Sequence, residues 1–419
     1  MKKIITISDH PLSPSGVGTQ TKYFIEALLD TGEYEVFSVA GAIKHGNYDM
    51  ISPEKYAGKW KILPVDGYGT RELIRELLQR EKPDCMWIMT DPRFYQWLWD
   101  MSDEIRTVCS LVYYHVWDNY PYPKFNKISY DCNDKTVAIS KLTYDILKTL
   151  SPDTNPVYLP HAVDQEFFKK RDDNGPQELK SQVYQNTPQR KDNFTVFWNS
   201  RNARRKQSGS LIFWFKDFLD QVGHDKANLI MHTDVKDPHG QDLEAIISEL
   251  GLVNGEVVFS TSKVDSNMLS MFYNFADCTI AVSDAEGFGL SMLESMACGT
   301  PIICTMTGGM QDQVTDGENW FGIGIEPSSK AIIGSQEIPW IYEDRLNGKD
   351  VVDALMKMYN MTPEEREELG NKALKNVEDR FSFKKYREQW VEVIDNVIEQ
   401  NGSWENRKNY DRWELMEIL

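Results

Sequence analysis

The stretch DCTIAVSDAEGFGLSMLESMACGTPIICT, residues 277–305, contains the pattern that decides the fold. Its apolar run at 277–283 predicts a buried strand, a glycine-rich turn follows, and 291–297 predicts a short helix that ends at a Gly-Thr-Pro sequence. A second apolar run at 301–305 predicts the next strand. Strand, helix and strand in this order make a βαβ unit, which predicts two parallel strands in one sheet.

The same alternation of strand-like and helical stretches continues in both directions along the chain. Alternation of this kind is typical of α/β domains with parallel sheets. Strands are predicted at 3–8, 34–40, 85–90, 107–115, 135–140 and 156–160, and then at 194–200, 228–233, 256–260, 277–283, 301–305 and 320–325. Helices are predicted at 20–29, 71–79, 92–101 and 142–150, and then at 211–222, 243–250, 266–275, 291–297 and 351–359.

A polar interval at 169–193 predicts a division into two domains. It contains two prolines, a glycine and charges of both signs, which is typical of an inter-domain connection, and 419 residues exceed one ordinary domain. We therefore expect doubly wound, Rossmann-like domains at 1–168 and 194–380. Residues 381–419 are expected to form helices that pack back toward the N-terminal domain. A central cleft between facing domains is the expected ligand site.

Composition and charge exclude few functions but weaken several. The formal net charge of −18 weakens a broad electrostatic grip on DNA or anionic lipid, although a local basic cleft can sit on an acidic body. No apolar run is long enough to cross a bilayer, and the N-terminus lacks the apolar core of a signal peptide, so we expect a cytoplasmic protein without a membrane span. The six cysteines show neither CxxC pairs nor metal-ligand spacing, so we expect buried free thiols.

Two glutamates near the glycine-rich turn are candidates for ligand binding. Glu286 lies in the loop after the strand, and Glu294 lies about one turn into the following helix. Two carboxylates held several ångströms apart suit a ligand rich in vicinal diols. The alternative is that Glu286 is only a favourable charge near a helix N-terminus and Glu294 a solvated helix residue. The backbone amides that could serve phosphate or sugar oxygens are those of Gly287, Phe288, Gly289 and Leu290.

Two further loops have the composition of anion-binding segments. WNSRNARRKQ, residues 198–207, follows a strand and carries four cations, so it suits a diphosphate; a solvated basic loop is the alternative. SDHPLSPSGVGTQT places Gly16 and Gly18 before an amphipathic helix, where amides can approach an anion. It matches neither the dinucleotide fingerprint nor the P-loop, and a tight structural turn is the alternative.

Together these segments resemble a known enzyme family. EGFGLSMLESMACGTPIICT resembles the E-x7-E signature of retaining glycosyltransferases with the GT-B fold, family 4 in particular. SPSGVGTQT is similar to the glycine loop of that family, YLPHAVDQEFF to its marker before the inter-domain crossing, SRNARRK to its G-R-x(3–5)-K segment, GGMQDQVTDGENWFGI to its later continuation and FSFKKYREQWVEVI to its terminal helix. The sequence departs from the family pattern at Ser200, His161-Ala162 and Gln311-Asp312.

The resemblance implies transfer of a sugar from a nucleoside-diphosphate sugar to an acceptor hydroxyl, with retention at the anomeric carbon. It implies that Glu286 holds donor-sugar hydroxyls and that Glu294 binds the ribose. It also implies that Arg201 and Lys206 bind the diphosphate and stabilise the leaving nucleoside diphosphate. Because cationic side chains would supply this charge and the sequence has no Asp-x-Asp motif, no essential metal and no cofactor are expected.

Four residues of the first half receive roles from the same resemblance. It places Gly16 and Gly18 against the phosphate or donor sugar. It places His115 near the reaction centre, with Asp118 beside it. Without the family, His115 is equally well explained as a satisfied polar group at a strand end.

The acceptor is expected to bind mainly to the N-terminal domain. The loop WDNYPY contains Trp117, Tyr120 and Tyr122, which with Asp118 predict a stacking platform for a sugar or a base. A glycan, a small molecule, a protein or a hydroxylated DNA base remains open as the acceptor, and so does the oligomeric state. Two other functions stay open: a GT-B-like UDP-sugar epimerase, and a non-catalytic protein that binds sugar nucleotides or glycans. The E-x7-E spacing favours transfer.

Overall fold

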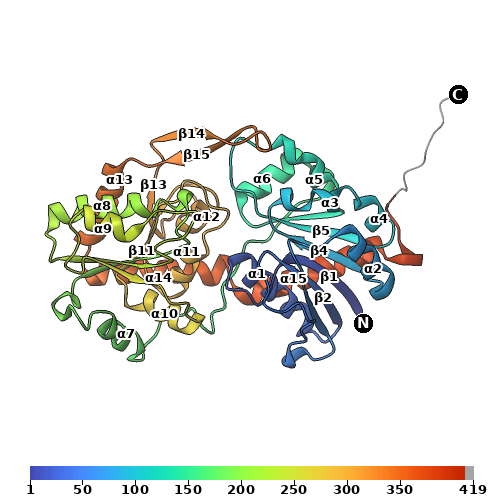
Figure 1. The fold of residues 1–419 in the computed structure, drawn as a ribbon, viewed down its shortest axis with the longest axis horizontal. Coiled ribbons are helices and arrows are strands. Elements are labelled where there is room, and N and C mark those ends of the chain that lie inside the picture. The colour runs from blue at the N-terminus through green and yellow to red at the C-terminus, as the bar shows by residue number, and fades with distance from the viewer. Residues whose placement is uncertain (411–419) are drawn as a thin grey trace. The chain divides into compact units, whose positions relative to one another are not determined.

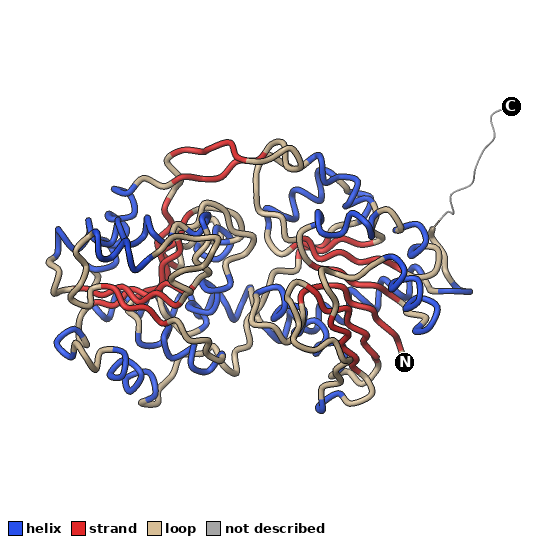
Figure 2. Tube along the Cα trace, viewed as in Figure 1, coloured by secondary structure: helices blue, strands red, loops and turns tan. Residues whose placement is uncertain are grey.

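The computed structural model describes residues 1–410, and the chain divides into two units. The first unit comprises Met1–Trp117, Tyr122–His161 and the described residues from Lys384 onward. The second comprises Asp118–Pro121 and Ala162–Phe383. Figure 1 traces the chain, and Figure 2 shows that each unit contains its own sheet with helices around it.

The first unit is built on a seven-stranded sheet in the order β3-β2-β1-β4-β5-β6-β7. Every neighbouring pair is parallel. The order reverses between β1 and β4, as in doubly wound folds. The strands are β1 (Lys2–Asp9), β2 (Tyr34–Gly41), β3 (Trp60–Pro64), β4 (Cys85–Met89), β5 (Ser110–His115), β6 (Lys135–Ala138) and β7 (Val157–Tyr158).

The helices of the first unit include one from the far end of the chain. They are α1 (Gly16–Leu29), α2 (Arg71–Glu81), α3 (Gln96–Trp99), α4 (Ser102–Arg106), α5 (Lys127–Asp131), α6 (Lys141–Leu150) and α15 (Phe383–Asn401). Trp390 of α15 is fully buried, with its ring 4.9 Å from that of Phe24 and 5.9 Å from that of Trp87. This aromatic contact fixes α15 in the core of the first unit (Figure 1).

The second unit has a six-stranded parallel sheet in the order β10-β9-β8-β11-β12-β13. Its strands are β8 (Phe194–Asn199), β9 (Ala227–His232), β10 (Val257–Ser260), β11 (Cys278–Ala281), β12 (Ile302–Thr305) and β13 (Gly322–Ile325). Its helices are α7 (Gly175–Val183), α8 (Ser208–Val222), α9 (Leu243–Glu249), α10 (Ser266–Phe275), α11 (Leu290–Ala297), α12 (Met310–Val314), α13 (Gly348–Asn360) and α14 (Pro363–Arg380). An antiparallel hairpin, β14 (Ser329–Ile333) and β15 (Ile341–Arg345), stands apart from this sheet (Figure 1).

The expected fold class, two doubly wound parallel α/β domains, is confirmed, and several local differences have physical causes. The interval 169–193 contains α7 and lies inside the second unit, because α7 packs against α10: a Cβ added at Gly175 would lie 3.4 Å from Met271. The chain therefore leaves the first unit earlier than the sequence predicts, after His161. The single helix expected at 92–101 is a 3-10 turn followed by the short α3.

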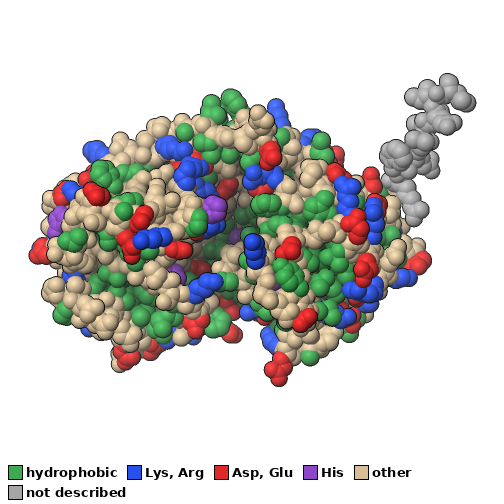
Figure 3. Space-filling view, in the orientation of Figure 1, with side chains coloured by type: hydrophobic (Ala, Val, Ile, Leu, Met, Phe, Trp, Pro, Cys, Tyr) green, Lys and Arg blue, Asp and Glu red, His purple; other side chains and the backbone are tan. Residues whose placement is uncertain are grey.

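The surface and the cysteines agree with their expected chemistry. Acidic and basic side chains are interspersed over the visible face of each unit (Figure 3). All six cysteines are free thiols, and all except the partly exposed Cys132 are buried. Within residues 1–410, no helix has the length and apolar character needed to cross a membrane.

Candidate active site

Two of the motifs found in the sequence meet at one edge of the second sheet. The strand order of that sheet reverses between β8 and β11, which are neighbours and parallel. Residues 200–207 follow β8 and residues 282–289 follow β11, so both loops leave the carboxyl ends of adjacent strands. In open α/β sheets this reversal point is where ligands bind. The sheet topology therefore brings the cationic loop and the glycine-rich loop together.

A buried cluster of opposite charges links these two loops. The ammonium group of Lys206 forms an ion pair with Oε2 of Glu286, and Nη1 of Arg205 lies 3.3 Å from the same oxygen. Arg205 also donates to the carbonyl of Ala285 at 2.6 Å. The side chains of Lys206 and Glu286 are only 12% and 15% exposed. Lys206 and Glu286 are thus largely shielded from water, whereas the side chain of Arg205 is 41% exposed.

The cations keep Glu286 ionised. Burial raises the pKa of the Glu286 carboxyl, but the nearby charges of Lys206 and Arg205 outweigh burial and leave that pKa below its ordinary value. Burial lowers the pKa of Lys206, against the opposing effect of Glu286. For Arg205 the attraction of Glu286 and Asp118 prevails over burial, and its pKa is raised.

Glu294 is held by a different set of partners. It lies in α11, and the hydroxyl of Tyr273 in α10 donates to its Oε2 at 2.6 Å. Asn199, the last residue of β8, donates to that hydroxyl at 2.8 Å. Burial raises the pKa of Glu294 to about 7, although the Tyr273 hydrogen bond acts in the opposite direction. Near neutral pH the site can therefore hold this carboxyl in either protonation state.

The turn between the two glutamates is shaped by glycines from a second loop. Gly289 has a φ of 89° and precedes α11, so no side chain caps the amides at the start of that helix. The Gly308 backbone approaches the turn so closely that a Cβ there would lie 1.8 Å from the carbonyl oxygen of Glu286. The amide of Gly309 donates to that oxygen at 3.1 Å. Phe288 is itself buried.

The four cations of the 200–207 loop divide between different partners. Arg201 is 61% exposed and is paired with Asp237, with Nε–Oδ2 and Nη2–Oδ1 distances of 2.6 and 3.1 Å. Arg204 donates both terminal nitrogens to Glu343. The structure therefore joins Arg205, rather than the predicted Arg201, to Lys206 and Glu286. The sequence could not distinguish these arginines because the 3-10 turn at Arg204–Lys206 decides which way each one points.

His115, in the first unit, is fully buried at the end of β5. Its Nε2 is 2.8 Å from the hydroxyl of Tyr130, and among the described residues its Nδ1 has no hydrogen-bond partner. Burial lowers the pKa of His115 to about 3, so the imidazole is neutral at physiological pH.

The glycine loop of the first unit has one packed and one exposed glycine. Gly16 is the first residue of α1 and is exposed. The side chain of Ser15 caps the helix by accepting the amide of Gly18 at 2.9 Å. A Cβ at Gly18 would lie 2.5 Å from Oγ of Ser13 and 2.7 Å from the carbonyl of His10. Gly18 is thus required by the packing of its own loop, whereas Gly16 is open to a ligand.

The predicted acceptor residues separate between the two units. Trp117 and Tyr122 belong to the first unit, where Trp117 is buried with its ring 5.7 Å from that of Phe125. Asp118 and Tyr120 belong to the second unit. There the carbonyl of Tyr120 accepts the amide of Tyr342 at 2.5 Å. The acceptor role of these four residues stays a prediction.

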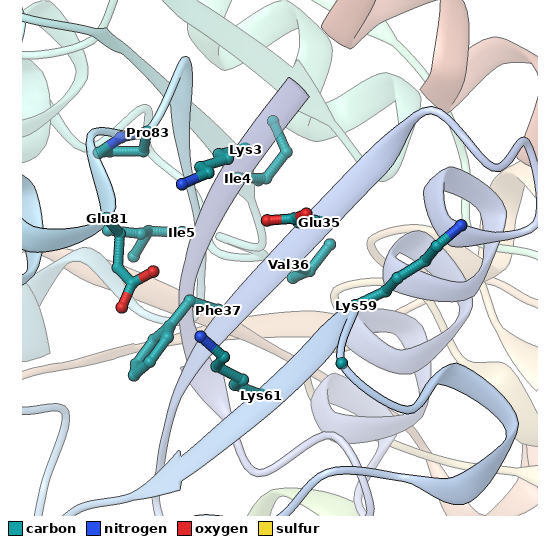
Figure 4. A pocket seen from close by; sticks show the side chains of 11 residues that line it. Lys3, Ile4, Ile5, Glu35, Val36, Phe37, Lys59, Lys61, Glu81 and Pro83 are labelled. Carbon is teal, nitrogen blue, oxygen red and sulfur yellow. The ribbon is translucent and has the colours of Figure 1, made fainter. Parts of the chain in front are cut away.

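A separate pocket in the first unit lies away from the ligand-binding edge. Its lining includes Lys3, Glu35 and Lys61 (Figure 4), which lie near the amino ends of β1, β2 and β3. Because ligands of parallel sheets bind at the carboxyl ends, this pocket belongs to no predicted site. Within residues 1–410, no group of three His, Cys, Asp or Glu side chains is arranged to hold a metal ion.

Comparisons with known proteins agree on the second unit and on the fold. Residues 183–376 match the family described as Glycosyl transferases group 1. A D-inositol 3-phosphate glycosyltransferase of Acidothermus cellulolyticus is 39% identical over 77 residues, which are 18% of this chain and 17% of that protein. The relative from Arthrobacter sp., of the same name, is 37% identical over 103 residues, 25% of this chain and 23% of that protein. The matched part thus spans about a fifth of the length of these relatives.

Solved structures extend the likeness to the whole fold. Sucrose-phosphate synthase from Thermosynechococcus elongatus superposes with a TM-score of 0.76 at 16% identity, covering 96% of this chain and 100% of that one. Anabaena HepE in complex with UDP and glucose gives 0.70 at 16% identity, covering 94% and 100%. At such identities the likeness concerns the fold alone. Residues 183–376 therefore resemble the glycosyl transferases group 1 family, and the chain shares the GT-B fold of two Rossmann-like domains with these solved structures.

Proposed function

We propose that the protein is a retaining glycosyltransferase that moves a sugar from a nucleoside-diphosphate sugar to an acceptor hydroxyl. The observation that supports this most is the Lys206–Glu286–Arg205 cluster at the strand-order reversal of the second sheet. A site with one buried and one half-exposed cation suits a diphosphate, and carboxylates beside it suit sugar hydroxyls. Charged groups with perturbed pKa values that gather at a ligand-binding edge are typical of functional sites.

Each residue of the cluster has a role in this proposal. Arg205 and Lys206 bind the diphosphate of the donor, and Glu286 turns from them to accept hydroxyls of the donor sugar. Glu294 accepts the two ribose hydroxyls, and its bond from Tyr273 fixes its direction. Arg201 stays a predicted diphosphate ligand that would have to leave Asp237. Gly16 and His115 stay predicted contacts from the first unit.

The proposed reaction breaks the bond between the anomeric carbon and the leaving phosphate oxygen, whose electron pair stays on the nucleoside diphosphate. The acceptor oxygen forms its bond to the same face of that carbon, and the acceptor proton passes to the departing phosphate. Negative charge therefore grows on the diphosphate in the transition state. Arg205 and Lys206 are already in place to stabilise it, which lowers the barrier without reorganisation. Because these cations supply the charge, we expect full activity in EDTA.

A donor panel tests the proposal. UDP-, GDP- and ADP-sugars are each incubated with the protein, with and without oligosaccharide acceptors, and nucleotide release and product are measured. UDP-glucose comes first, because UDP and glucose are bound in the Anabaena structure. We expect transfer, with the anomeric configuration of the donor kept in the product by NMR. Conversion of the donor without an acceptor would favour an epimerase, and binding without turnover would favour a non-catalytic protein.

A further inference from the structure

The hairpin β14–β15 has two faces of opposite character. Side chains alternate along a strand, so Ile341, Glu343 and Arg345 point to one side and Tyr342 and Asp344 to the other. Ile341 and Glu343 are buried. We call their side the inner face and the side of Tyr342 and Asp344 the outer face.

The inner face is fixed to both loops of the candidate active site. Glu343 accepts from both terminal nitrogens of Arg204, at 2.8 and 2.6 Å, and Arg204 belongs to the turn that contains Arg205 and Lys206. Arg345 donates to Asp284 at 2.9 Å, two residues before Glu286. If the hairpin moved away, Glu343 and Asp284 would lose the cations that compensate their buried charges. The cost of leaving such charges uncompensated holds the hairpin in one position.

The outer face exposes aromatic and aliphatic side chains. Ile332 pairs with Tyr342 across the hairpin and Lys330 pairs with Asp344. Trp340 is 49% exposed, and its ring lies 5.8 Å from that of Tyr342. Hydrophobic side chains are visible over the hairpin at the top of Figure 3. The outer face is therefore an aromatic surface on a rigid support.

A small pocket connects this outer face with the donor loop. Its lining includes the carboxylates of Asp118, Asp284 and Asp344 and the single ammonium group of Lys330. Tyr120 and Tyr342 supply its aromatic part, and Ala285, next to Glu286, also lines it. The pocket thus combines hydroxyl-accepting groups with ring faces, directly beside the sugar-binding end of the proposed donor site.

We propose that the outer face of the hairpin and this pocket bind the acceptor, and that the acceptor is an uncharged, hydroxyl-rich sugar ring. The inference rests on the proposed transferase function. The aromatic rings of Trp340 and Tyr342 stack on the apolar face of such a ring, and the carboxylates accept its hydroxyls. Asp284 is compensated by Arg345, but a phosphorylated acceptor or DNA would bring its anion beside the carboxylates of Asp118 and Asp344, which disfavours binding of that anion. The chemistry selects a neutral glycan.

Trp340→Ala tests the proposal, with Trp320→Ala as the matched control. Trp320 is 51% exposed in the same unit and lies outside the surface just described. The donor chosen by the panel is combined with maltose, cellobiose and chitobiose, and with glucose 6-phosphate. We expect Trp340→Ala to raise the acceptor KM for the best neutral disaccharide about two- to tenfold, as loss of one stacking contact would. Hydrolysis of the donor without acceptor should stay at the wild-type rate in Trp320→Ala.

Equal acceptor KM values for Trp340→Ala and Trp320→Ala would overturn the proposal, and so would better use of glucose 6-phosphate than of neutral sugars. A separate binding measurement keeps this test distinct from the transferase proposal. Saturation-transfer NMR of the same neutral disaccharides needs no turnover, and we expect binding to the wild type and to Trp320→Ala but not to Trp340→Ala. Absence of donor turnover would count against the transferase proposal, whereas absence of disaccharide binding would overturn the acceptor surface.

Discussion

The buried carboxyl of Glu294 leads to a prediction about stability. Its pKa rises from 4.5 to about 7 in the folded protein, mainly through burial. Each pKa unit corresponds to about 1.4 kcal/mol, so the ionised side chain costs the folded state about 3 kcal/mol at most. Relaxation and entry of water reduce that cost. Glu294→Gln removes the charge and keeps an oxygen that can accept from Tyr273, so it should stabilise the second unit at alkaline pH.

The size of this stabilisation depends on pH. Below about pH 4.5 the carboxyl is protonated in both the folded and the unfolded chain, so wild type and variant should be equally stable. Between pH 4.5 and about 7 the unfolded state ionises first, and the wild type loses stability as pH rises. Above that range the full difference should appear. The variant should also bind nucleoside diphosphate more weakly, because the carboxylate that costs stability is the group proposed to accept the ribose hydroxyls.

Urea denaturation of the second unit at pH 5 and pH 8.5 measures the effect. Glu249→Gln is the control, because Glu249 is exposed on α9 of the same unit. We expect the free energy of unfolding of Glu294→Gln to exceed that of the wild type by about 1–3 kcal/mol at pH 8.5 and by much less at pH 5. A difference that is the same at both pH values would refute the argument that burial raises this pKa.

Two further predictions concern the donor loops. Gly308→Ala places a Cβ 1.8 Å from the carbonyl oxygen of Glu286 at a φ of 50°. We therefore expect the free energy of unfolding to fall by about 3 kcal/mol and the Tm by about 6–12 °C. An unchanged Tm would contradict the packing described. Arg205→Ala and Lys206→Met should each weaken binding of nucleoside diphosphate about tenfold or more by calorimetry, because each removes a cation that is joined to Glu286. Arg201→Ala should weaken binding less, because Arg201 is paired with Asp237 instead, and the reverse order would return the main role to Arg201.

The fold was largely predictable because its strands are apolar runs. Buried parallel strands such as β4, β11 and β12 carry few polar residues, and the helices between them show a clear period. The hairpin β14–β15 was missed because the buried Glu343 and the partly buried Arg345 occupy positions where an apolar residue would mark a strand. In the sequence alone, a charged residue whose partner lies far away along the chain cannot be distinguished from a solvent-exposed charged residue.

The candidate site was predictable only where its residues lie close together in the sequence. Glu286 and Glu294 are only eight residues apart, in a loop and in the helix that directly follows it. Their proximity therefore follows from local structure. Tyr273 was missed because it lies in another helix and had the pattern of an ordinary core residue. Asp118 was assigned to the N-terminal domain because spacing does not reveal that residues 118–121 pair with the hairpin.

A crystal structure with the nucleoside diphosphate selected by the donor panel tests the central claim most directly. The account predicts diphosphate oxygens within hydrogen-bonding distance of the Lys206 ammonium and the Arg205 guanidinium groups. It also predicts that the ribose hydroxyls donate to Glu294, with the nucleotide at the carboxyl ends of β8 and β11. A nucleotide bound at any other edge of the sheet, or with its diphosphate away from Arg205 and Lys206, would contradict it.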